Sequence, residues 1–363
     1  MNKFYPLTIS HIQVETRESV SISLCVPDEY KAKFHYQQGQ YLVFKHVIKG
    51  QEERRSYSIC SSVNDEHLKV GIKQVEGGVF SSFANQELKV GDVIDVMPPQ
   101  GQFGAGINTL LDNKQPNRHV LAVAAGSGIT PILSIIKTYL EQDSKGQVTL
   151  LYGNRSTASA MFRNTLEDLK NTYMDRLNLI FLFTRENQDI DLYNGRIDGA
   201  KCEQLLKRLF QVETLAAAFI CGPQTMTEEV SNSLIEQGLA KENVHYELFY
   251  TDSENTLART KRENNKVQMF EASDVTVIHD GRQMQFELPK NTKTILEAGN
   301  DIGADLPYSC TAGVCSTCRA KVIEGEVEMD VNFALEDYEV EAGYVLSCQC
   351  YPISKKVVLS YDQ

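Results

Sequence analysis

The sequence has no long hydrophobic run, and its N-terminus, MNKFYPLTIS, has no basic segment followed by an apolar one. Its most apolar stretch, residues 120–136, is interrupted by Gly126, Ser127, Gly128 and Pro131. A membrane-spanning helix needs about 20 apolar residues in succession, and a secretory leader needs the two-part N-terminal pattern. The sequence therefore predicts a cytoplasmic protein without a membrane span.

Basic residues are also in deficit, since 36 Lys and Arg stand against 48 Asp and Glu and give a net charge of -12. A chain of this charge would repel a nucleic-acid backbone, so nucleic acid is a poor candidate partner. The excess is uneven, because residues 273–363 hold 15 acidic and 7 basic residues. Charge of one sign speeds encounter with a partner of the opposite sign, although an acidic run is more often only a solvated face.

Histidine is scarce and scattered, with seven residues and no H-x-x-E or H-x-x-x-H pair. Iron centres of oxygenases usually draw on such pairs. The sequence therefore predicts that this chain holds no mononuclear or di-iron oxygenase centre of its own.

What the chain does have is enough length, at 363 residues, for two or three domains. In the first hundred residues, short alternating strands such as 20–26, 41–47 and 68–73 occur with almost no helical period. This pattern predicts an antiparallel β-barrel, which we place at residues 1–108.

From about residue 119, apolar strands alternate with helical segments. We expect strands at 119–125, 148–153, 177–183 and 217–222, and helices at 131–141 and 161–170. Such alternation predicts a doubly wound parallel α/β sheet, placed at 109–252. A polar stretch without apolar period predicts a linker at 253–272, and residues 273–363 would form a third domain.

Five of the nine cysteines lie within the last 54 residues. Cys310, Cys315 and Cys318 have x4 and x2 spacing, and Cys348 follows thirty positions later. This spacing matches plant-type 2Fe-2S ligation. A structural zinc site would usually contain two C-x2-C pairs, and only one is present. Cys350 competes for the fourth place, because in CQC on a strand both side chains would point to one face. We predict Cys348.

The segment DLPYSCTAGVCSTC, followed by LSCQ, resembles plant-type ferredoxins over about residues 273–363. The resemblance implies an α+β domain of the β-grasp type that carries a 2Fe-2S cluster.

Two segments of the expected barrel, RRSYSI at 54–59 and EGGVFS at 76–81, resemble the flavin-binding segments of the ferredoxin-NADP reductase superfamily. The resemblance implies FAD, with Arg55 on its pyrophosphate, Tyr57 on the isoalloxazine and Ser58 near the nitrogen that receives hydride. Guanidinium groups, aromatic faces and glycine backbone suit those tasks chemically. The glycine-rich segment contributes Gly77, Gly78, Val79 and Ser81.

Two segments of the expected parallel sheet resemble the nicotinamide-binding segments of the same superfamily. GSGITP follows a strand and opens a helix, where backbone donors suit a dinucleotide pyrophosphate, and CGPQTM follows another strand. The expected contacts come from Gly126, Gly128, Thr130, Pro131, Cys221, Gly222, Pro223 and Met226.

Ser58, Cys221 and Glu247 match the superfamily's serine, cysteine and glutamate around the nicotinamide and flavin rings. The resemblance implies that these residues orient the rings and assist hydride or proton movement. Cys221 could otherwise be a buried core cysteine on a strand.

The preference between coenzymes rests on arginines. Thr184 and Arg185 resemble the segment that grips the 2'-phosphate of NADP, Tyr193 would be its stacking tyrosine, and Arg155 would add charge. NADPH is therefore expected, with NADH left open, because these arginines could also be ordinary solvent-facing residues.

The order of barrel, nucleotide domain, linker and ferredoxin-like domain resembles the reductase components of multicomponent oxygenases, and among them the phenylacetyl-CoA epoxidase reductases. The resemblance implies transfer from NAD(P)H to FAD, to the 2Fe-2S cluster, and to a partner oxygenase. Two alternatives remain: a reductase for another acceptor, such as an aromatic-ring dioxygenase or a hybrid-cluster protein, and a noncatalytic electron-transfer subunit.

Overall fold

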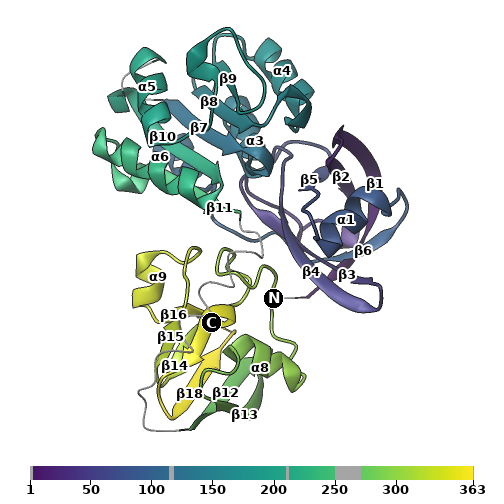
Figure 1. Ribbon diagram of the computed structural model, residues 1–363. Helices are drawn as coiled ribbons and strands as arrows, with labels where there is room; N and C mark the ends of the chain where they lie inside the picture. Colours follow the sequence, from purple (N-terminus) through teal and green to yellow (C-terminus); the bar gives the residue numbers. More distant parts are fainter. Residues whose placement is uncertain (1–2, 114–117, 210–211, 250–270, 363) are drawn as a thin grey trace. The chain divides into compact units, whose positions relative to one another are not determined.

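The computed structural model describes residues 3–113, 118–209, 212–249 and 271–362 (Figure 1). They form two compact units, and the boundary between them lies after Phe249. The predicted linker at 253–272 falls outside the described residues except for its last two. Within the described residues, no helix is both long enough and apolar enough to cross a membrane.

The N-terminal part of the first unit is an antiparallel sheet of six strands in the order β4-β3-β6-β1-β2-β5. An isolated bridge between Ile59 and Val70 links the chain after β4 to β5, and so joins the two ends of the sheet. Alternate residues such as Leu7, Ile9 and Ile22 are buried inside, which confirms the predicted antiparallel domain. The strands are β1 (Tyr5–Thr16), β2 (Ser19–Cys25), β3 (Tyr41–Ile48), β4 (Gln51–Ser58), β5 (Leu68–Lys73) and β6 (Val93–Val96).

The expectation of almost no helix in the first hundred residues is wrong at one place. Helix α1 (Val79–Gln86) follows directly after the two glycines at 77 and 78. Phe80 and Ala84, four positions apart, are buried against the barrel, so the helix is held by packing. Only eight residues long, it offers too little periodicity to be recognised from sequence.

The second part of the first unit is a five-stranded parallel sheet in the order β11-β10-β7-β8-β9. One hydrophobic core contains Ile132 of α3 and Leu166 of α4, and a separate core contains Leu205 of α5 and Val230 of α6. The sheet is therefore doubly wound, as predicted. The elements are β7 (His119–Ala125), β8 (Gln147–Asn154), β9 (Leu177–Phe183), β10 (Leu215–Gly222), β11 (Val244–Leu248), α3 (Ile129–Gln142), α4 (Arg163–Thr172), α5 (Gly199–Leu209) and α6 (Gln224–Glu236).

Hydrogen bonds join the barrel to helix α3 of the parallel sheet. The Ser134 hydroxyl donates to the Ser61 carbonyl at 2.6 Å in a buried contact, and the Ser62 hydroxyl donates to the Glu141 carboxylate. Buried polar bonds of this kind are costly to break. The boundary predicted after residue 108 falls within helix α2 (Ala105–Asn113), whose Ile107 packs in the core of the parallel sheet.

The C-terminal unit contains a mixed sheet in the order β13-β12-β18-β14-β16 and a two-stranded sheet β15-β17. The only parallel pair among these described ladders is β12 with β18. Helix α8 begins with a capping box between Thr294 and Glu297. The α+β expectation is confirmed. The elements are β12 (Ala272–His279), β13 (Arg282–Pro289), β14 (Arg319–Glu324), β15 (Val327–Met329), β16 (Tyr344–Leu346), β17 (Cys350–Pro352), β18 (Lys356–Ser360), α8 (Ile295–Asp301) and α9 (Asp337–Glu341).

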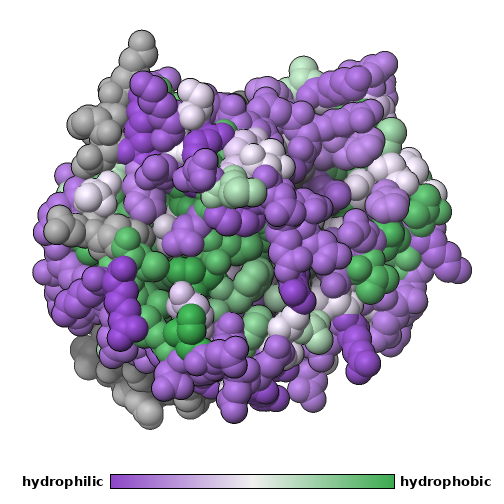
Figure 2. Space-filling model, turned by 90° about the horizontal axis from the view of Figure 1, so that it is seen from above, coloured by the Kyte–Doolittle hydropathy of each residue, from purple (hydrophilic) through white to green (hydrophobic). Residues whose placement is uncertain are grey.

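The surface is mainly hydrophilic. Figure 2 shows one face covered largely by polar and charged residues, with apolar residues gathered near its middle. Large apolar side chains that are exposed include Val14, Met174 and Tyr338, which lie on three different elements or loops. Single exposed apolar residues of this kind are normal for globular proteins.

Candidate functional site

The segments predicted to bind the coenzyme all follow the carboxyl ends of parallel strands. Gly126 comes after β7, Arg155 after β8 and Thr184 after β9, and Pro223 comes after β10. The chain order reverses between β7 and β10, which are neighbours in the sheet. Ligands of open α/β sheets bind at such a switch point. The structure therefore brings these segments to one edge, where a dinucleotide would bind.

The glycine loop packs directly on the end of β10. Gly126 has a φ of +55°, and a Cβ at Gly128 would lie 2.2 Å from the Cys221 carbonyl oxygen, so no side chain fits there. The Thr130 hydroxyl donates to the Ser127 carbonyl at 3.0 Å and fixes the turn into α3. This close approach leaves backbone at the helix N-terminus available to a phosphate.

The neighbouring segment is just as tightly packed. Gly222 ends β10, and a Cβ there would lie 2.6 Å from the Met226 methyl carbon. Pro223 is the N-cap of α6, and Met226 is buried beneath it. Pro131 is likewise buried, in the first turn of α3. Met226, Pro131 and the buried Gly222 therefore shape the backbone, and the exposed residue of this segment is Pro223.

The three predicted catalytic residues come together. The Ser58 hydroxyl, at the end of β4, donates to the Glu247 carboxylate at 3.4 Å. Cys221 on β10 is the register partner of Glu247 on β11. Burial, and then the Glu247 charge, raise the pKa of Cys221 well above its usual range. Cys221 is therefore a neutral thiol, which excludes a thiolate nucleophile here.

The predicted flavin contacts lie on β4. Arg55 is 39% exposed, and its guanidinium pairs with Glu53 at 3.1 Å. The Tyr57 ring is half-buried, with its centroid 5.7 Å from that of Phe44 and 5.5 Å from that of Phe80. Burial raises the pKa of Tyr57, so its hydroxyl stays neutral. An aromatic ring and a cation on one strand fit a flavin with its pyrophosphate.

The N-terminus of helix α1 is a second candidate phosphate-binding site. Its N-cap is Gly78, and no side chain caps the helix, so the first N–H groups lack an intrahelical partner. Gly77 has a φ of +74°, and a Cβ at Gly78 would lie 2.6 Å from the Ser81 hydroxyl. That hydroxyl accepts from Val75 N at 3.1 Å and so shapes the turn. Val79, an exposed residue, is the first of the helix, and this N-terminus fits an anionic group.

Two arginines meet at the edge of β8 and β9. The Arg185 amide donates to the Arg155 carbonyl at 2.8 Å, and both side chains are exposed. The Thr184 amide similarly donates to Asn154, and half-buried Tyr193 packs on the adjoining core. The arrangement provides two cations within one loop pair, which suits an additional phosphate.

Lys73 was not anticipated from the sequence. It ends β5 in the barrel, and its Nζ lies 3.7 Å from where a Cβ at Gly126 would be. Burial, and then the charge of Arg155, lower its pKa. A lysine in a strand gives no sign that the fold will carry it to a glycine loop more than fifty residues away. It places a cation beside the predicted pyrophosphate site.

In the C-terminal unit, the four predicted metal ligands form two pairs. A hydrogen bond between the Cys310 and Cys315 side chains raises the pKa of Cys310 and lowers that of Cys315, and one between Cys318 and Cys348 raises the pKa of Cys318. Among the described residues, no three His, Cys, Asp or Glu side chains are placed to hold one metal ion. Two pairs of thiolates, one pair for each iron, fit a 2Fe-2S cluster with bridging sulfides.

The prediction that Cys348 and Cys350 share a strand face is wrong. Residues 347–349 form a 3₁₀ turn, and β17 begins only at Cys350. Cys350 is fully buried in the core and is the register partner of Met329. The turn aims Cys348 at Cys318 instead, which supports the choice of Cys348 as fourth ligand.

Donors surround the cysteine sulfurs. The Ala312 amide donates to Cys310 Sγ at 3.3 Å, and Thr317 donates to Cys315. The Gln349 side-chain amide lies 3.7 Å from Cys348 Sγ. Sequence spacing predicted the four ligands and not the side-chain donors, since which side chain turns toward a sulfur depends on loop conformation.

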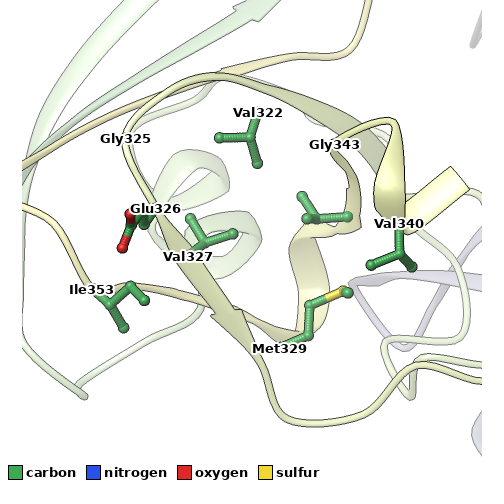
Figure 3. Close-up of a pocket in the computed structure, with 9 residues that line it drawn as sticks. Val322, Gly325, Glu326, Val327, Met329, Val340, Gly343 and Ile353 are labelled. Carbon is green, nitrogen blue, oxygen red and sulfur yellow. The ribbon is translucent and has the colours of Figure 1, made fainter. Parts of the chain in front are cut away.

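A cavity of about 340 Å³ also lies in the C-terminal unit (Figure 3). Its lining is apolar apart from Glu326, and none of the four predicted ligands belongs to it. It is therefore separate from the cluster site. The lining residues are Val322, Gly325, Glu326, Val327, Met329, Val340, Gly343, Val345 and Ile353.

The chain matches three families of domains. Residues 7–104 match an oxidoreductase FAD-binding domain, residues 122–232 an oxidoreductase NAD-binding domain, and residues 277–352 a 2Fe-2S iron-sulfur cluster binding domain. The predicted cofactor types are thereby confirmed. Phthalate dioxygenase reductase has a similar fold, with a TM-score of 0.58, 20% identity and 98% of each chain covered.

Relatives match over the full length. One subunit of the 1,2-phenylacetyl-CoA epoxidase of Escherichia coli is 41% identical, with 100% of this chain and 99% of the relative covered. The ferredoxin reductase component of a 3-ketosteroid-9-alpha-monooxygenase from Rhodococcus rhodochrous is 30% identical, with 98% and 96% covered. The chain therefore belongs to the family of oxygenase reductase components in which FAD-binding, NAD-binding and 2Fe-2S domains are joined in one polypeptide.

Proposed function

We propose that this chain takes electrons from NADPH and delivers them to the oxygenase subunits of a phenylacetyl-CoA epoxidase in the cytoplasm. The observation that carries the proposal is the 41% identity to the epoxidase subunit of Escherichia coli over the whole chain. The clustered thiols support the reducing compartment. A 3-ketosteroid monooxygenase is the second candidate acceptor, supported by the 30% identical reductase component.

We assign the hydride site to Ser58, Cys221 and Glu247. When bound, the flavin accepts a hydride and the cluster carries single electrons, so the two groups divide an electron pair between one-electron steps. The neutral Cys221 thiol is fully buried on β10, so in this proposal it would pack behind the nicotinamide ring and beside Glu247, its register partner. The Ser58 hydroxyl donates to Glu247 and would keep its carboxylate beside the bound rings, to take or return a proton.

The proposed pyrophosphate contacts come from both parts of the first unit. Arg55 and the uncapped N-terminus of α1 would hold that of FAD, and Lys73 with the Gly126–Gly128 turn would hold that of the coenzyme. Arg155 and Arg185 would hold the 2'-phosphate. Neither of these two guanidinium groups forms an ion pair with a described residue, and Glu186 is already bonded to Thr157.

The cluster would be held by Cys310 with Cys315 and by Cys318 with Cys348. The domain divisions at 108 and 252, and the linker to 272, remain part of the proposal.

The test is reconstitution. The purified chain, loaded with FAD and cluster, is mixed with the oxygenase subunits of phenylacetyl-CoA epoxidase, NADPH and phenylacetyl-CoA, and epoxide is measured against NADPH consumed. We expect stoichiometric coupling. Rapid ferricyanide reduction without epoxide would overturn the assignment of acceptor, and the same assay with 3-ketosteroid oxygenase would then test the second candidate.

A further inference from the structure

The turn that carries Cys348 also buries an amide side chain against its sulfur. Gln349 is 7% exposed, and its Nε2 lies 3.7 Å from Cys348 Sγ and donates to the Thr311 carbonyl at 2.8 Å. Nε2 carries two hydrogens, so one can bond the carbonyl while the other points to sulfur. The side chain thus spans from the fourth cysteine to the loop that carries the first.

The backbone holds this side chain in place. The Gln349 carbonyl accepts from Asp330 N at 3.0 Å, and Ser347 donates to the Cys318 carbonyl from both its amide and its hydroxyl. A Cβ at Gly313 would lie 3.2 Å from Gln349 Cγ, so this glycine leaves the space that the glutamine fills. The turn is therefore held by bonds to Asp330 and Cys318, and the amide itself by its bond to the Thr311 carbonyl.

A fixed donor beside a ligand sulfur has a predictable electrostatic effect. Reduction adds negative charge to an iron-sulfur cluster, and a hydrogen bond to sulfur stabilises that charge, more so where water is excluded. We propose that Gln349 is a positioning residue that raises the midpoint potential of the cluster through its amide. The inference rests on the proposed ligation by Cys348.

Two variants test the donor. In Gln349→Met the amide is replaced by a side chain of similar length without a donor, and in Gln349→Glu it is replaced by a carboxylate of the same shape. Asn332→Asp is the matched control, because Asn332 bonds only backbone atoms in the same unit, at Ala334 and Leu335. It reproduces the change from amide to carboxylate without touching a sulfur.

The measurement is a redox titration of the cluster, followed by optical absorbance and EPR, with iron content as a check on assembly. We expect the ratio of reduced to oxidised cluster at a fixed applied potential to fall about tenfold in Gln349→Met, equivalent to about 59 mV for one electron. The fall should be at least as large in Gln349→Glu and clearly smaller in Asn332→Asp. A titration of Gln349→Met that superimposes on the wild type, with full iron content, would overturn the inference.

If the variants lose the cluster, an experiment on the unsubstituted protein still tests the contact between Gln349 and the Cys348 sulfur. Glutamine labelled with ¹⁵N in its side chain is incorporated, and the reduced cluster is examined by pulsed EPR for a ¹⁵N coupling. Gln349 is the one described glutamine whose amide contacts a cysteine sulfur. We expect a coupling, and its absence would refute the contact.

A wrong ligand assignment and a wrong role for Gln349 give different results. If Cys348→Ser keeps a normal cluster, the proposed ligation itself is wrong. If Cys348→Ser loses the cluster but the Gln349 variants keep the wild-type potential, only the present inference fails.

Discussion

At the scale of single residues, Cys348 and Cys350 stand two positions apart and differ in surroundings. Cys348 lies in a turn against Cys318, and Cys350 is buried in a strand against Met329. We therefore expect Cys348→Ser to lose the cluster and Cys350→Ser to keep two irons per chain, about the wild-type amount. Iron and sulfide assays of both purified variants provide the measurement. A full complement of iron in Cys348→Ser would contradict the assignment.

The coenzyme preference gives a second prediction at this scale. Loss of a charge-assisted bond to the 2'-phosphate should raise KM for NADPH in Arg185→Ala by roughly tenfold to a hundredfold and leave KM for NADH nearly unchanged. Steady-state ferricyanide reduction with both coenzymes measures this.

Lys73→Met serves as the matched variant for Arg185→Ala. Because Lys73 lies beside the Gly126 turn and not at the 2'-phosphate edge, its loss should raise both Michaelis constants by similar factors. Equal responses of NADPH and NADH to Arg185→Ala would show that this arginine does not bind the phosphate.

At the scale of elements, the contact between the glycine loop and β10 leaves no room for a side chain. In Gly128→Ala, the new Cβ would lie 2.2 Å from the Cys221 carbonyl oxygen, so the loop must shift. A misplacement of about 1 Å in reacting groups can cost about a hundredfold in rate. We expect FAD and cluster to be retained and flavin reduction by NADPH to slow to that extent in anaerobic stopped-flow measurements.

Reduction by dithionite should be normal in Gly128→Ala, because it bypasses the coenzyme site. Gly50→Ala is the control for a strained glycine substitution away from this loop, since Gly50 has a φ of +82° and a Cβ there would meet nothing within 4 Å. Wild-type rates with NADPH in Gly128→Ala would show that the coenzyme does not bind at this loop.

Elements with strong periodicity were predictable from sequence. The strand expected at 177–183 is β9, and the helix expected at 131–141 is α3 extended by a few residues. Both are long and regularly patterned. Helix α1 was missed because eight residues after two glycines carry little pattern, and the turn at 347–349 was mistaken for a strand because C-Q-C alternates.

For the site, the sequence could supply residues attached to motifs and not those brought in by folding. Ser58 and Glu247, which form a hydrogen bond, could both be recognised from motifs, one in the barrel and the other in the parallel sheet. Lys73 comes from a barrel strand, and its place beside Gly126 depends on how barrel and sheet pack. Such tertiary neighbours carry no local signal.

At the scale of the whole molecule, the excess negative charge is concentrated in the last quarter of the chain, which contains 15 acidic and 7 basic residues. We expect a basic docking surface on the oxygenase, and a rate of its reduction that falls as salt rises. The Debye length shrinks from ~10 Å at 0.1 M to ~3 Å at 1 M, which screens the attraction. The rate of partner reduction is measured across this range.

Ferricyanide reduction is the control for this salt series, because it reports coenzyme oxidation without protein docking. If both rates change with salt in the same way, the acidic residues keep the protein in solution and do not guide a partner.

The bonds between barrel and α3 also determine how reductases of this kind can be recombined. They join Ser61 to Ser134, 73 positions apart, and Ser62 to Glu141, 79 positions apart. A chimaera with its barrel from one parent and its parallel sheet from another must keep the backbone carbonyl at 61 within reach of the hydroxyl at 134 and must match the side chains at 62 and 141, or leave a buried hydroxyl without an acceptor. A crossover at residues 250–270 separates neither pair. The block that two parent reductases can exchange intact is therefore the first unit, residues 1–249.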